Sequence, residues 1–384
     1  MAIDFAKIGE SADLEDLVQH DAYEEWKQAE GVPTIKGFYI DDLKTVEVHP
    51  WPRKGGKGVI INLEGTGGVN DAHVVEIAPG GKSEPEHHMY EEMVYILKGR
   101  GSTSVWYDEN AKSTFEWAAG SLFAIPLNAT YQFFNGSGQE PVRYVSVTQA
   151  PTMMRLFHSN DFIFNNPWQF RDRFSGDARY FSGEGKMYRR TARRMWTANF
   201  VSDIHTMSLP LRPDRGGGGR NIHLELASNS MGAHISQFQV GMYKKGHRHG
   251  PGAHVIILGG TGYSLLWKNE GDERKKCDWR PGAVVVPPAD WFHQHFNTGP
   301  EPARYLALRM GGSTFRQTES VVRGEGTGTS LKLGGWQIEY EDEDPEIHKL
   351  YEAEVKAHGA PCLMKGLVEG CTGGYGVMEK GGDD

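Results

Sequence analysis

The sequence has 384 residues, enough for two domains of ordinary size, and 38% of them are apolar before the 49 glycines are counted, which argues against a disordered chain. The net charge of −9 argues against a nucleic-acid-binding protein, and no apolar run reaches the roughly 18 residues that cross a membrane. Because the first residues lack the apolar core of a secretion signal, we expect a cytoplasmic protein. The three cysteines, Cys277, Cys362 and Cys371, are too few and too scattered for a disulfide framework or a CxxC zinc site.

The N-terminal part of the chain divides into an arm and a first β domain. Residues 1–55 form the arm, in which an amphipathic pattern over 14–29 predicts a helix. Residues 56–155 are typical of β structure, because short runs of β-branched and aromatic residues at 73–78 and 93–97 are bounded by Gly or Pro.

A linker is expected over residues 156–221. It contains a basic and aromatic cluster at 188–196, which we interpret as solvated surface or interdomain packing. The glycine run 216–219 at its end predicts a flexible joint.

A second β domain is predicted over residues 222–315, with strands at 253–258 and 283–287. The remaining residues, 316–384, form a C-terminal extension. Pro345 opens a pattern that predicts one helix there, over 345–358.

The two β domains are copies of one unit. At an offset of 161 positions, and with one residue slipped in a connecting loop, landmark residues recur in the same order. The matched pairs include Gly80 and Gly241, His88 and His249, Gly99 and Gly260, Trp117 and Trp279, Pro126 and Pro288, Asn135 and Asn297, and Tyr144 and Tyr305. Two copies rich in short strands favour an all-β molecule built from two closed barrels or double-sheet jelly rolls.

The second copy carries candidate metal ligands. His247 and His249 are two residues apart, and residues with that spacing on a strand point to the same face. Both imidazoles can therefore enter one barrel interior, and His293 can supply a third ligand from a neighbouring strand. Three neutral imidazoles suit zinc, copper, iron or nickel and leave coordination positions open.

Two further residues beside His293 are candidates for contact with a substrate. His295 should face the same interior, as a second-sphere acid, base or hydrogen-bond donor, or else it orients Asn297. Trp291 can form a wall of the pocket, or be an ordinary core residue.

These motifs resemble those of the cupin superfamily, and the repeat resembles a two-domain cupin, or bicupin, over 70–150 and 230–310. The family pairs a motif of Gly, His-x-His, Glu and Gly with a second motif of Gly, Pro, His and Asn. The second copy matches through Gly241, His247, His249, Gly260, Gly282, Pro288, His293 and Asn297. Asp290 replaces a motif glycine, and the motif Glu is missing.

Two site models follow from the missing Glu. If Ala253 takes its place, the site resembles that of the three-histidine iron(II) dioxygenases of the gentisate and salicylate type, with one open flank. If His254 takes its place, a site with four histidines results. A shift of one residue turns a side chain to the opposite face, and the ungapped spacing to Gly260 favours Ala253.

The first copy departs further from the family pattern. Its corresponding residues are Glu86, His88, Glu92 and Tyr131. One histidine and two carboxylates could hold a hard divalent ion. We favour a degenerate barrel whose polar interior is satisfied by internal hydrogen bonds.

The resemblance implies a metal-dependent oxygenase, similar to the dioxygenases, that acts on a small chelating substrate of anionic or aromatic character. The alternatives are an oxygen-independent decarboxylase, lyase or isomerase, or a non-enzymatic binding or storage protein. One divalent transition metal per chain is expected. Fe(II) is favoured, with Mn, Cu, Ni or Zn left open. The expected partners are the substrate and dioxygen, without nucleic acid or membrane, and the tandem copies are compatible with a homodimer.

Overall fold

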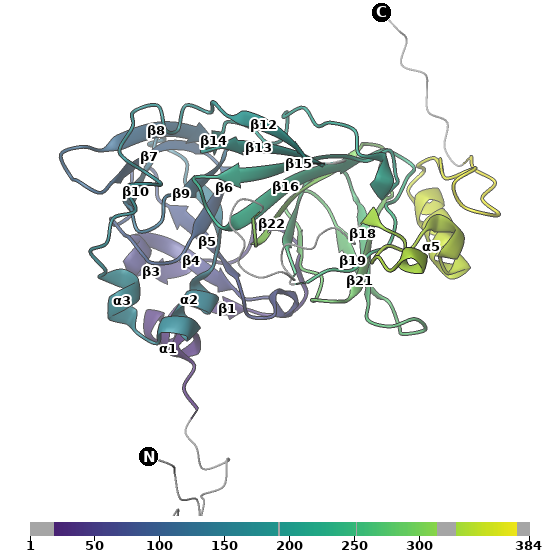
Figure 1. Cartoon of the computed structure of the whole chain (residues 1–384), viewed down its shortest axis with the longest axis horizontal. Coiled ribbons are helices and arrows are strands. Elements are labelled where there is room, and N and C mark those ends of the chain that lie inside the picture. The colour runs from purple at the N-terminus through teal and green to yellow at the C-terminus, as the bar shows by residue number, and fades with distance from the viewer. Residues whose placement is uncertain (1–18, 191–192, 251, 313–327, 375–384) are drawn as a thin grey trace, which may run out of the picture.

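In the computed structural model, each half of the chain pairs its strands into one large and one small sheet, and the two sheets form a jelly-roll barrel (Figure 1). The structure describes residues 19–190, 193–250, 252–312 and 328–374. The two barrels lie side by side, the first in purple and blue and the second in green (Figure 1). The predicted all-β molecule of two tandem barrels with a few peripheral helices is confirmed.

The first barrel has a large sheet and a small sheet of three strands. The large sheet has the order β1 (Thr34–Ile35), β4 (Gly56–Ile61), β5 (Asp71–Ile77), β11 (Val142–Thr148), β6 (Glu92–Lys98), β9 (Leu122–Ile125) and β14 (Phe200–Val201), with β3 (His49–Trp51) also paired to β4. The small sheet has the order β10 (Thr130–Asn135), β7 (Arg100–Trp106) and β8 (Ser113–Ala118).

The second barrel repeats this plan. Its large sheet has the order β12 (Lys186–Arg190), β13 (Arg193–Ala198), β15 (Arg220–Leu226), β16 (Met231–Phe238), β22 (Ala303–Met310), β17 (His254–Gly259), β20 (Val284–Val285) and β2 (Tyr39–Ile40). Its small sheet has the order β19 (Lys275–Trp279), β18 (Gly262–Trp267) and β21 (Phe292–Asn297). The central order β5–β11–β6–β9 therefore recurs as β16–β22–β17–β20, as the sequence repeat predicts.

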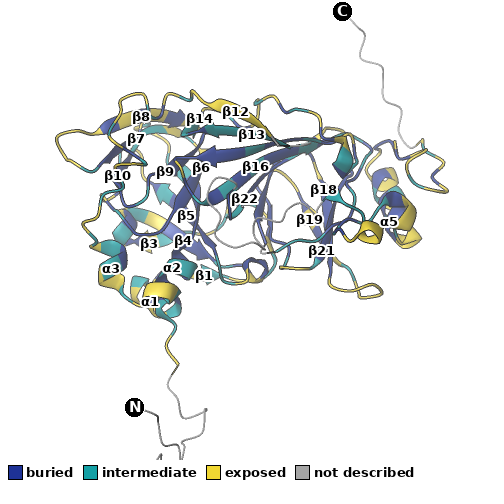
Figure 2. Cartoon of the chain, viewed as in Figure 1, coloured by how far each residue is buried: buried dark blue, intermediate teal, exposed yellow. Residues whose placement is uncertain are grey.

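The arm and the predicted linker join the barrels to each other. β2, in the arm, pairs with β20 of the second barrel, while β14, in the linker, pairs with β9 of the first. The linker also adds β12 and β13 to the second large sheet. The large sheets share one apolar core, in which Val74 and Val147 of the first barrel lie with Ile235 and Leu308 of the second. In Figure 2 these strands are mostly dark blue, which marks buried residues.

The part of the chain that the structure describes has four α-helices outside the sheets: α1 (Ala22–Glu30), α2 (Ala150–Phe157), α3 (Asn160–Phe164) and α5 (Pro345–Ala357). The C-terminal helix is found where the sequence predicts it. The N-terminal helix begins at Ala22, because the Asp21 side chain caps it by accepting hydrogen bonds from the next backbone amides. Residues 14–18 of the predicted helix are outside the described residues.

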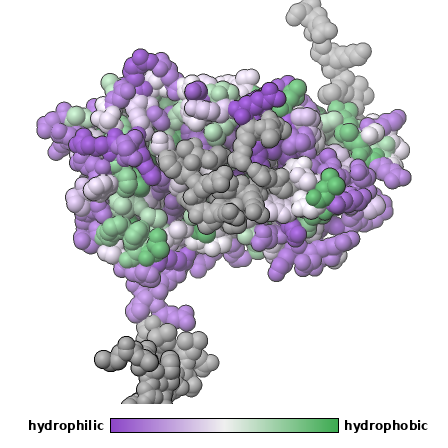
Figure 3. All heavy atoms as spheres, viewed as in Figure 1, coloured by the Kyte–Doolittle hydropathy of each residue, from purple (hydrophilic) through white to green (hydrophobic). Residues whose placement is uncertain are grey.

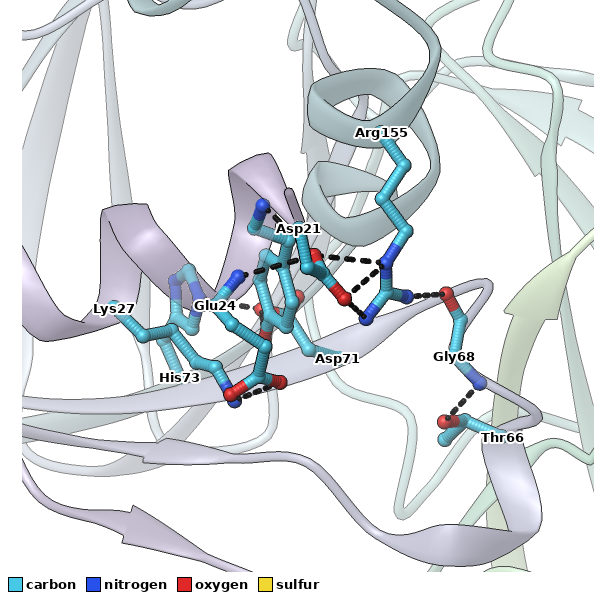
Figure 4. A network of polar contacts seen from close by, with 9 residues as sticks. Asp21, Glu24, Lys27, Thr66, Gly68, Asp71, His73 and Arg155 are labelled. Carbon is cyan, nitrogen blue, oxygen red and sulfur yellow. Dashed lines mark hydrogen bonds and ion pairs between the residues drawn. The ribbon is translucent and has the colours of Figure 1, made fainter. Parts of the chain in front are cut away.

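Helix α1 is fastened to the first barrel by polar contacts (Figure 4). Arg155 of α2 donates to both carboxylate oxygens of Asp21 and, at 2.8 Å, to the carbonyl oxygen of Gly68. Tyr23 donates to the Asp71 carboxylate at 2.6 Å inside the barrel. The start of the helix is thus tied to α2, a loop and β5.

The glycine run 216–219 is a packed turn and not the predicted flexible joint. The Gly216 amide donates to the Pro213 carbonyl, and the Gly219 amide donates to the Gly216 carbonyl. Gly217 has a φ of +61°, and a Cβ atom there would lie 2.9 Å from the Tyr243 carbonyl oxygen. Backbone conformation and close packing both require glycine here.

The face drawn in Figure 3 is mostly hydrophilic, with an apolar patch near α2 and α3. The exposed apolar side chains of this region include Leu156 and Trp168, each 64% exposed. No helix of the described residues is both long enough and apolar enough to cross a membrane.

A substitution at the contact between the barrels tests this arrangement. A Cβ atom on Gly65 would lie 2.0 Å from the Val286 carbonyl oxygen. Gly65→Ala should therefore destabilise the protein by about 1–3 kcal/mol or more, the usual effect of overpacking. Gly138→Ala is the control, because nothing lies within 4 Å of a Cβ atom there. Equal urea midpoints for the two variants would contradict the close contact.

Candidate metal centre

Three predicted ligands meet inside the second barrel. His293 lies in β21, and its backbone exchanges two hydrogen bonds with that of His247, at 2.8 and 3.1 Å. His249 follows two residues later, so its side chain points to the same interior. The three ring centroids are 4.1 to 5.4 Å apart, and one ring nitrogen of each lies within 4.8 Å of the others.

The three imidazoles fit a divalent transition metal. The buried Nδ1 atoms of His247 and His249 have no hydrogen-bond partner among the described residues, while the Nδ1 of His293 lies 3.3 Å from the Trp291 carbonyl oxygen. Burial lowers the pKa of His293 to about 4, and burial and neighbouring cationic groups hold the pKa of the other two well below the ordinary value. Each ring is therefore neutral near pH 7, as a metal ligand must be.

His254 is not part of this cluster. It is 1% exposed, and its Nδ1 atom lies 3.1 Å from the side-chain nitrogen, Nδ2, of Asn70 in the first barrel. Ala253, the preceding residue, lines the same cavity as the three histidines. Because adjacent side chains point to opposite faces, the register has Ala253 at the position of the missing Glu, and the four-histidine site does not form in this structure.

The cavity beside the histidines is small and strongly cationic. Its volume is about 70 Å³, which is room for about five water-sized groups. Among the described residues, no carboxylate lines it. The cationic side chains that line it are Arg193, Arg212, Arg215, Arg220, Lys244 and Arg309.

Hydrogen bonds fix several of these cations in place. Arg212 donates to the amide oxygen of Asn221 at 3.2 Å, and Arg215 donates to that of Gln337 at 3.0 Å. Asp214 pairs with Arg212, but it does not line the cavity. The cavity therefore has an excess of positive charge in a chain whose net charge is −9, an environment suited to an anion.

Lys244 and Tyr305 form a buried pair in the cavity wall. The Lys244 ammonium donates to the Tyr305 hydroxyl at 3.1 Å and also to Ser236. Burial lowers the pKa of Lys244. Burial alone would raise the pKa of Tyr305, but the Lys244 ammonium, the Ser236 hydroxyl and Arg215 together outweigh it, and the pKa is lowered. The contact between Lys244 and Tyr305 was not predicted from the sequence, because no sequence motif links these two residues.

His295 lines the cavity and Trp291 does not. The Nδ1 atom of His295 lies 2.7 Å from the Ser264 hydroxyl, which also accepts a hydrogen bond from the Trp279 indole. Trp291 instead faces Phe38, with ring centroids 6.2 Å apart. Contact between Trp291 and a substrate was predicted from its position in the motif, but the ring lies outside the cavity lining.

The first barrel brings its four predicted residues together and closes the space with a lysine. Lys54 donates to Glu86 at 2.8 Å, and Tyr131 donates to Glu92 at 2.8 Å. The Nε2 atom of His88 lies 3.1 Å from the Oε2 atom of Glu92. Burial would raise the pKa of Glu92, but Lys54 and His88 outweigh it and hold that pKa well below its usual range. These contacts agree with the degenerate-barrel hypothesis.

Aromatic side chains fill the rest of the first interior. Tyr131 and Phe133 of β10 take the places that His293 and His295 occupy in β21, and the Phe133 ring stacks on Tyr144 with centroids 4.5 Å apart. The second interior is instead lined by alanines such as Ala253 and Ala307. Smaller side chains thus leave space for a ligand in the second barrel.

Comparison with known proteins finds one family model that matches part of the first barrel, and solved structures of low similarity. The family model "Cupin domain" matches residues 73–148, from β5 to β11 of the first barrel. Among solved structures, oxalate decarboxylase from Bacillus subtilis at pH 4.6 has 13% identity and a TM-score of 0.47 over 72% of this chain and 77% of that one. A structure of the same enzyme, reported with an EPR assignment of its Mn(II) centres, has 13% identity, a TM-score of 0.47, and coverage of 72% and 78%. No curated protein sequence matches the chain.

Metal binding by the second barrel can be tested with two histidine variants. His247→Ala should abolish the metal held by the three histidines, because it removes a buried ligand. His254→Ala should keep the affinity of the wild type, because that side chain contacts Asn70. Titration of metal-free protein with Fe(II) or Mn(II) measures both. Loss of binding in His254→Ala alone would contradict the assignment.

The first barrel should contribute stability and not metal binding. Lys54→Met leaves Glu86 as a buried, unpaired carboxylate, which should cost about 3–5 kcal/mol. Adding Glu86→Leu should recover much of this loss, because both charges are then gone. Urea unfolding measures the stabilities. Loss of metal from the second barrel in the double variant would show that the two interiors are linked.

Proposed function

We propose that the second barrel is the active centre of a metal-dependent enzyme that converts a small anionic organic acid without using oxygen, as a decarboxylase or lyase does. The observation that carries the proposal is the meeting of three neutral imidazoles with a cavity lined by cations and, within the described residues, by no carboxylate. A divalent ion held there would keep its full charge and polarise a chelating carboxylate.

The cavity supports a short substrate. Room for about five water-sized groups suits a carboxylic acid with few carbons better than a substituted aromatic ring. Arg212 and Arg215 are held in fixed positions by amide side chains, so they can bind carboxylate oxygens with little loss of side-chain entropy. Charge and size both favour a small mono- or dicarboxylic acid.

Proton transfer is the part of the reaction that the protein itself can supply. Loss of carbon dioxide or a neighbouring group leaves an electron pair on carbon, which must be protonated. The Ser264 hydroxyl can donate to the Nδ1 of His295, which leaves the imidazole proton on Nε2 for donation. Lys244 and Tyr305 form a second proton-carrying pair in the same wall. We assign His295 as the first candidate acid.

A dioxygenase reaction is the second candidate. The small Ala253 side chain, at the position of the missing Glu, leaves one flank of the three histidines open. An open flank suits simultaneous binding of a chelating substrate and dioxygen, and Fe(II) would then be the metal. Fe(II) and the resemblance to gentisate-type enzymes remain predictions.

Turnover with and without oxygen separates the two candidates. Metal-loaded protein is incubated with short acids such as oxalate, malonate and 2-oxo acids, and the products and oxygen uptake are followed. We expect equal turnover in air and under nitrogen. Turnover that stops under nitrogen and consumes oxygen in proportion to product would favour the dioxygenase. If neither occurs while the acids bind, the centre is a binding site.

Lys244→Met should separate function from stability. Removing a buried cation that meets an anionic substrate should raise KM by roughly 10- to 100-fold, the effect of one charged hydrogen bond. The same change should leave the free energy of unfolding unchanged or raise it, because burying an ammonium without a carboxylate is unfavourable. Lys268→Met, at an exposed position, is the control. A lower stability with normal KM would show that Lys244 is only structural.

A further inference from the structure

The C-terminal extension carries a second set of side chains with metal-binding chemistry, on the outer side of the second barrel. Helix α5 supplies His348 and Glu352, one helical turn apart, and the segment after it supplies Cys362 and Cys371. One ligand atom of each lies within 4.8 Å of the other three. The histidine and both cysteines are at most 8% exposed, and Glu352 is half-buried.

Two distances in this cluster match the edges of a tetrahedron around one zinc ion. The sulfur atoms of Cys362 and Cys371 are 3.6 Å apart, and the Nε2 of His348 is 3.3 Å from a Glu352 oxygen. Zinc–sulfur bonds of about 2.3 Å give a tetrahedral edge of about 3.8 Å, and bonds of about 2.05 Å to nitrogen and oxygen give an edge of about 3.4 Å. These two pairs of atoms are therefore spaced as zinc ligands are, and the remaining pairs lie within 4.8 Å.

Two hydrogen bonds, from Tyr243 to Glu343 and from His348 to Tyr243, form a relay that leaves the Nε2 atom of His348 free to bind a metal. Tyr243 donates its hydroxyl proton to the Glu343 carboxylate at 2.6 Å. Since that proton is used, the 3.2 Å contact between the Tyr243 oxygen and the Nδ1 of His348 needs Nδ1 to be the donor. The neutral ring then has its lone pair on Nε2, a buried atom that lies 3.3 Å from the Glu352 carboxylate and makes no well-formed hydrogen bond among the described residues. Zinc-bound histidines are typically oriented by such a partner.

We infer that His348, Glu352, Cys362 and Cys371 bind one structural Zn²⁺ ion, distinct from the metal of the three histidines. Two thiolates, one imidazole and one carboxylate suit tetrahedral zinc and disfavour magnesium or calcium, which need more oxygen ligands. All four positions are taken by protein atoms, as in a structural site and unlike a catalytic one.

The position of the site explains what the ion would stabilise. Helix α5 and the cysteine segment cover the small sheet of the second barrel through an apolar cluster that includes Phe296, Tyr351 and Cys362. Tyr351 donates to the Asn297 carbonyl at 3.0 Å, at the end of β21. The ion would thus hold the extension against the strand that carries His293. In Figure 1 this helix lies beside β18, β19 and β21.

Metal analysis of the full chain tests the proposal. The purified protein should contain one zinc per chain that persists in His293→Ala and is lost in Cys362→Ser and Cys371→Ser. Cys277→Ser is the matched control, because Cys277 is equally buried, in β19, and outside the cluster. The assignment would be overturned if zinc remained bound in both Cys362→Ser and Cys371→Ser, or if it were lost in His293→Ala.

Cobalt gives a readout that does not depend on activity. Co(II) in place of zinc should produce a thiolate charge-transfer band and the visible bands of tetrahedral cobalt. Both should persist in His247→Ala and change in Cys371→Ser. If Cys362 and Cys371 instead form a disulfide, the protein mass falls by two hydrogens and neither band appears. That result would overturn the proposal.

Two milder variants keep the test valid if the cysteine variants fail to fold. Tyr243→Phe should weaken zinc binding by roughly 10- to 100-fold, the usual effect of removing the partner of a metal-bound histidine. Tyr351→Phe also loses one buried hydrogen bond but should leave zinc affinity unchanged. Affinities are measured by competition with a chromophoric chelator. Equal zinc affinity in the two variants would contradict the role of Tyr243, and absence of zinc binding in both variants and in the wild type would contradict the site.

Discussion

A nitrogen or oxygen atom buried inside a barrel needs a partner, and this requirement shapes both halves of the molecule. The first barrel meets it with its own side chains, since Lys54 pairs with Glu86 and Tyr131 fills the centre. The second barrel leaves imidazole nitrogens without protein partners beside an excess of positive charge. One fold thus gives a closed, structural interior and an open one, which the metal ion and the anion that we propose would complete.

The strands, the repeat and the three histidines could be predicted from the sequence, because each depends on local periodicity. Alternation along a strand decides that His247 and His249 share a face and that Ala253 and His254 do not. The glycine landmarks recur because both barrels turn at equivalent places. These features need no knowledge of which distant strands pair.

The cations of the cavity could not be predicted in the same way. Arg193 belongs to the basic cluster that we interpreted as surface or interdomain packing, and it reaches the cavity only because β13 pairs in parallel with β15. Lys244 lies between Gly241 and His247, at a position that the motif leaves unspecified. Trp291 is outside the cavity lining because its ring packs against Phe38 of the arm. Each case depends on tertiary contacts that spacing does not encode.

The cluster that contains Cys362 and Cys371 could not be predicted from sequence spacing either. Separated by eight residues, Cys362 and Cys371 match no short motif, and their partners His348 and Glu352 come from a helix face. Only the packing of α5 brings the four together. The segment before α5 also contacts the strand of the candidate metal centre, because Gln294 of β21 donates to Glu343 at 2.5 Å on the outer side. His293 and His295, the neighbours of Gln294, face inward. β21 is therefore held from its outer face, and a strand fixed in this way can keep its imidazoles in position before any ligand binds.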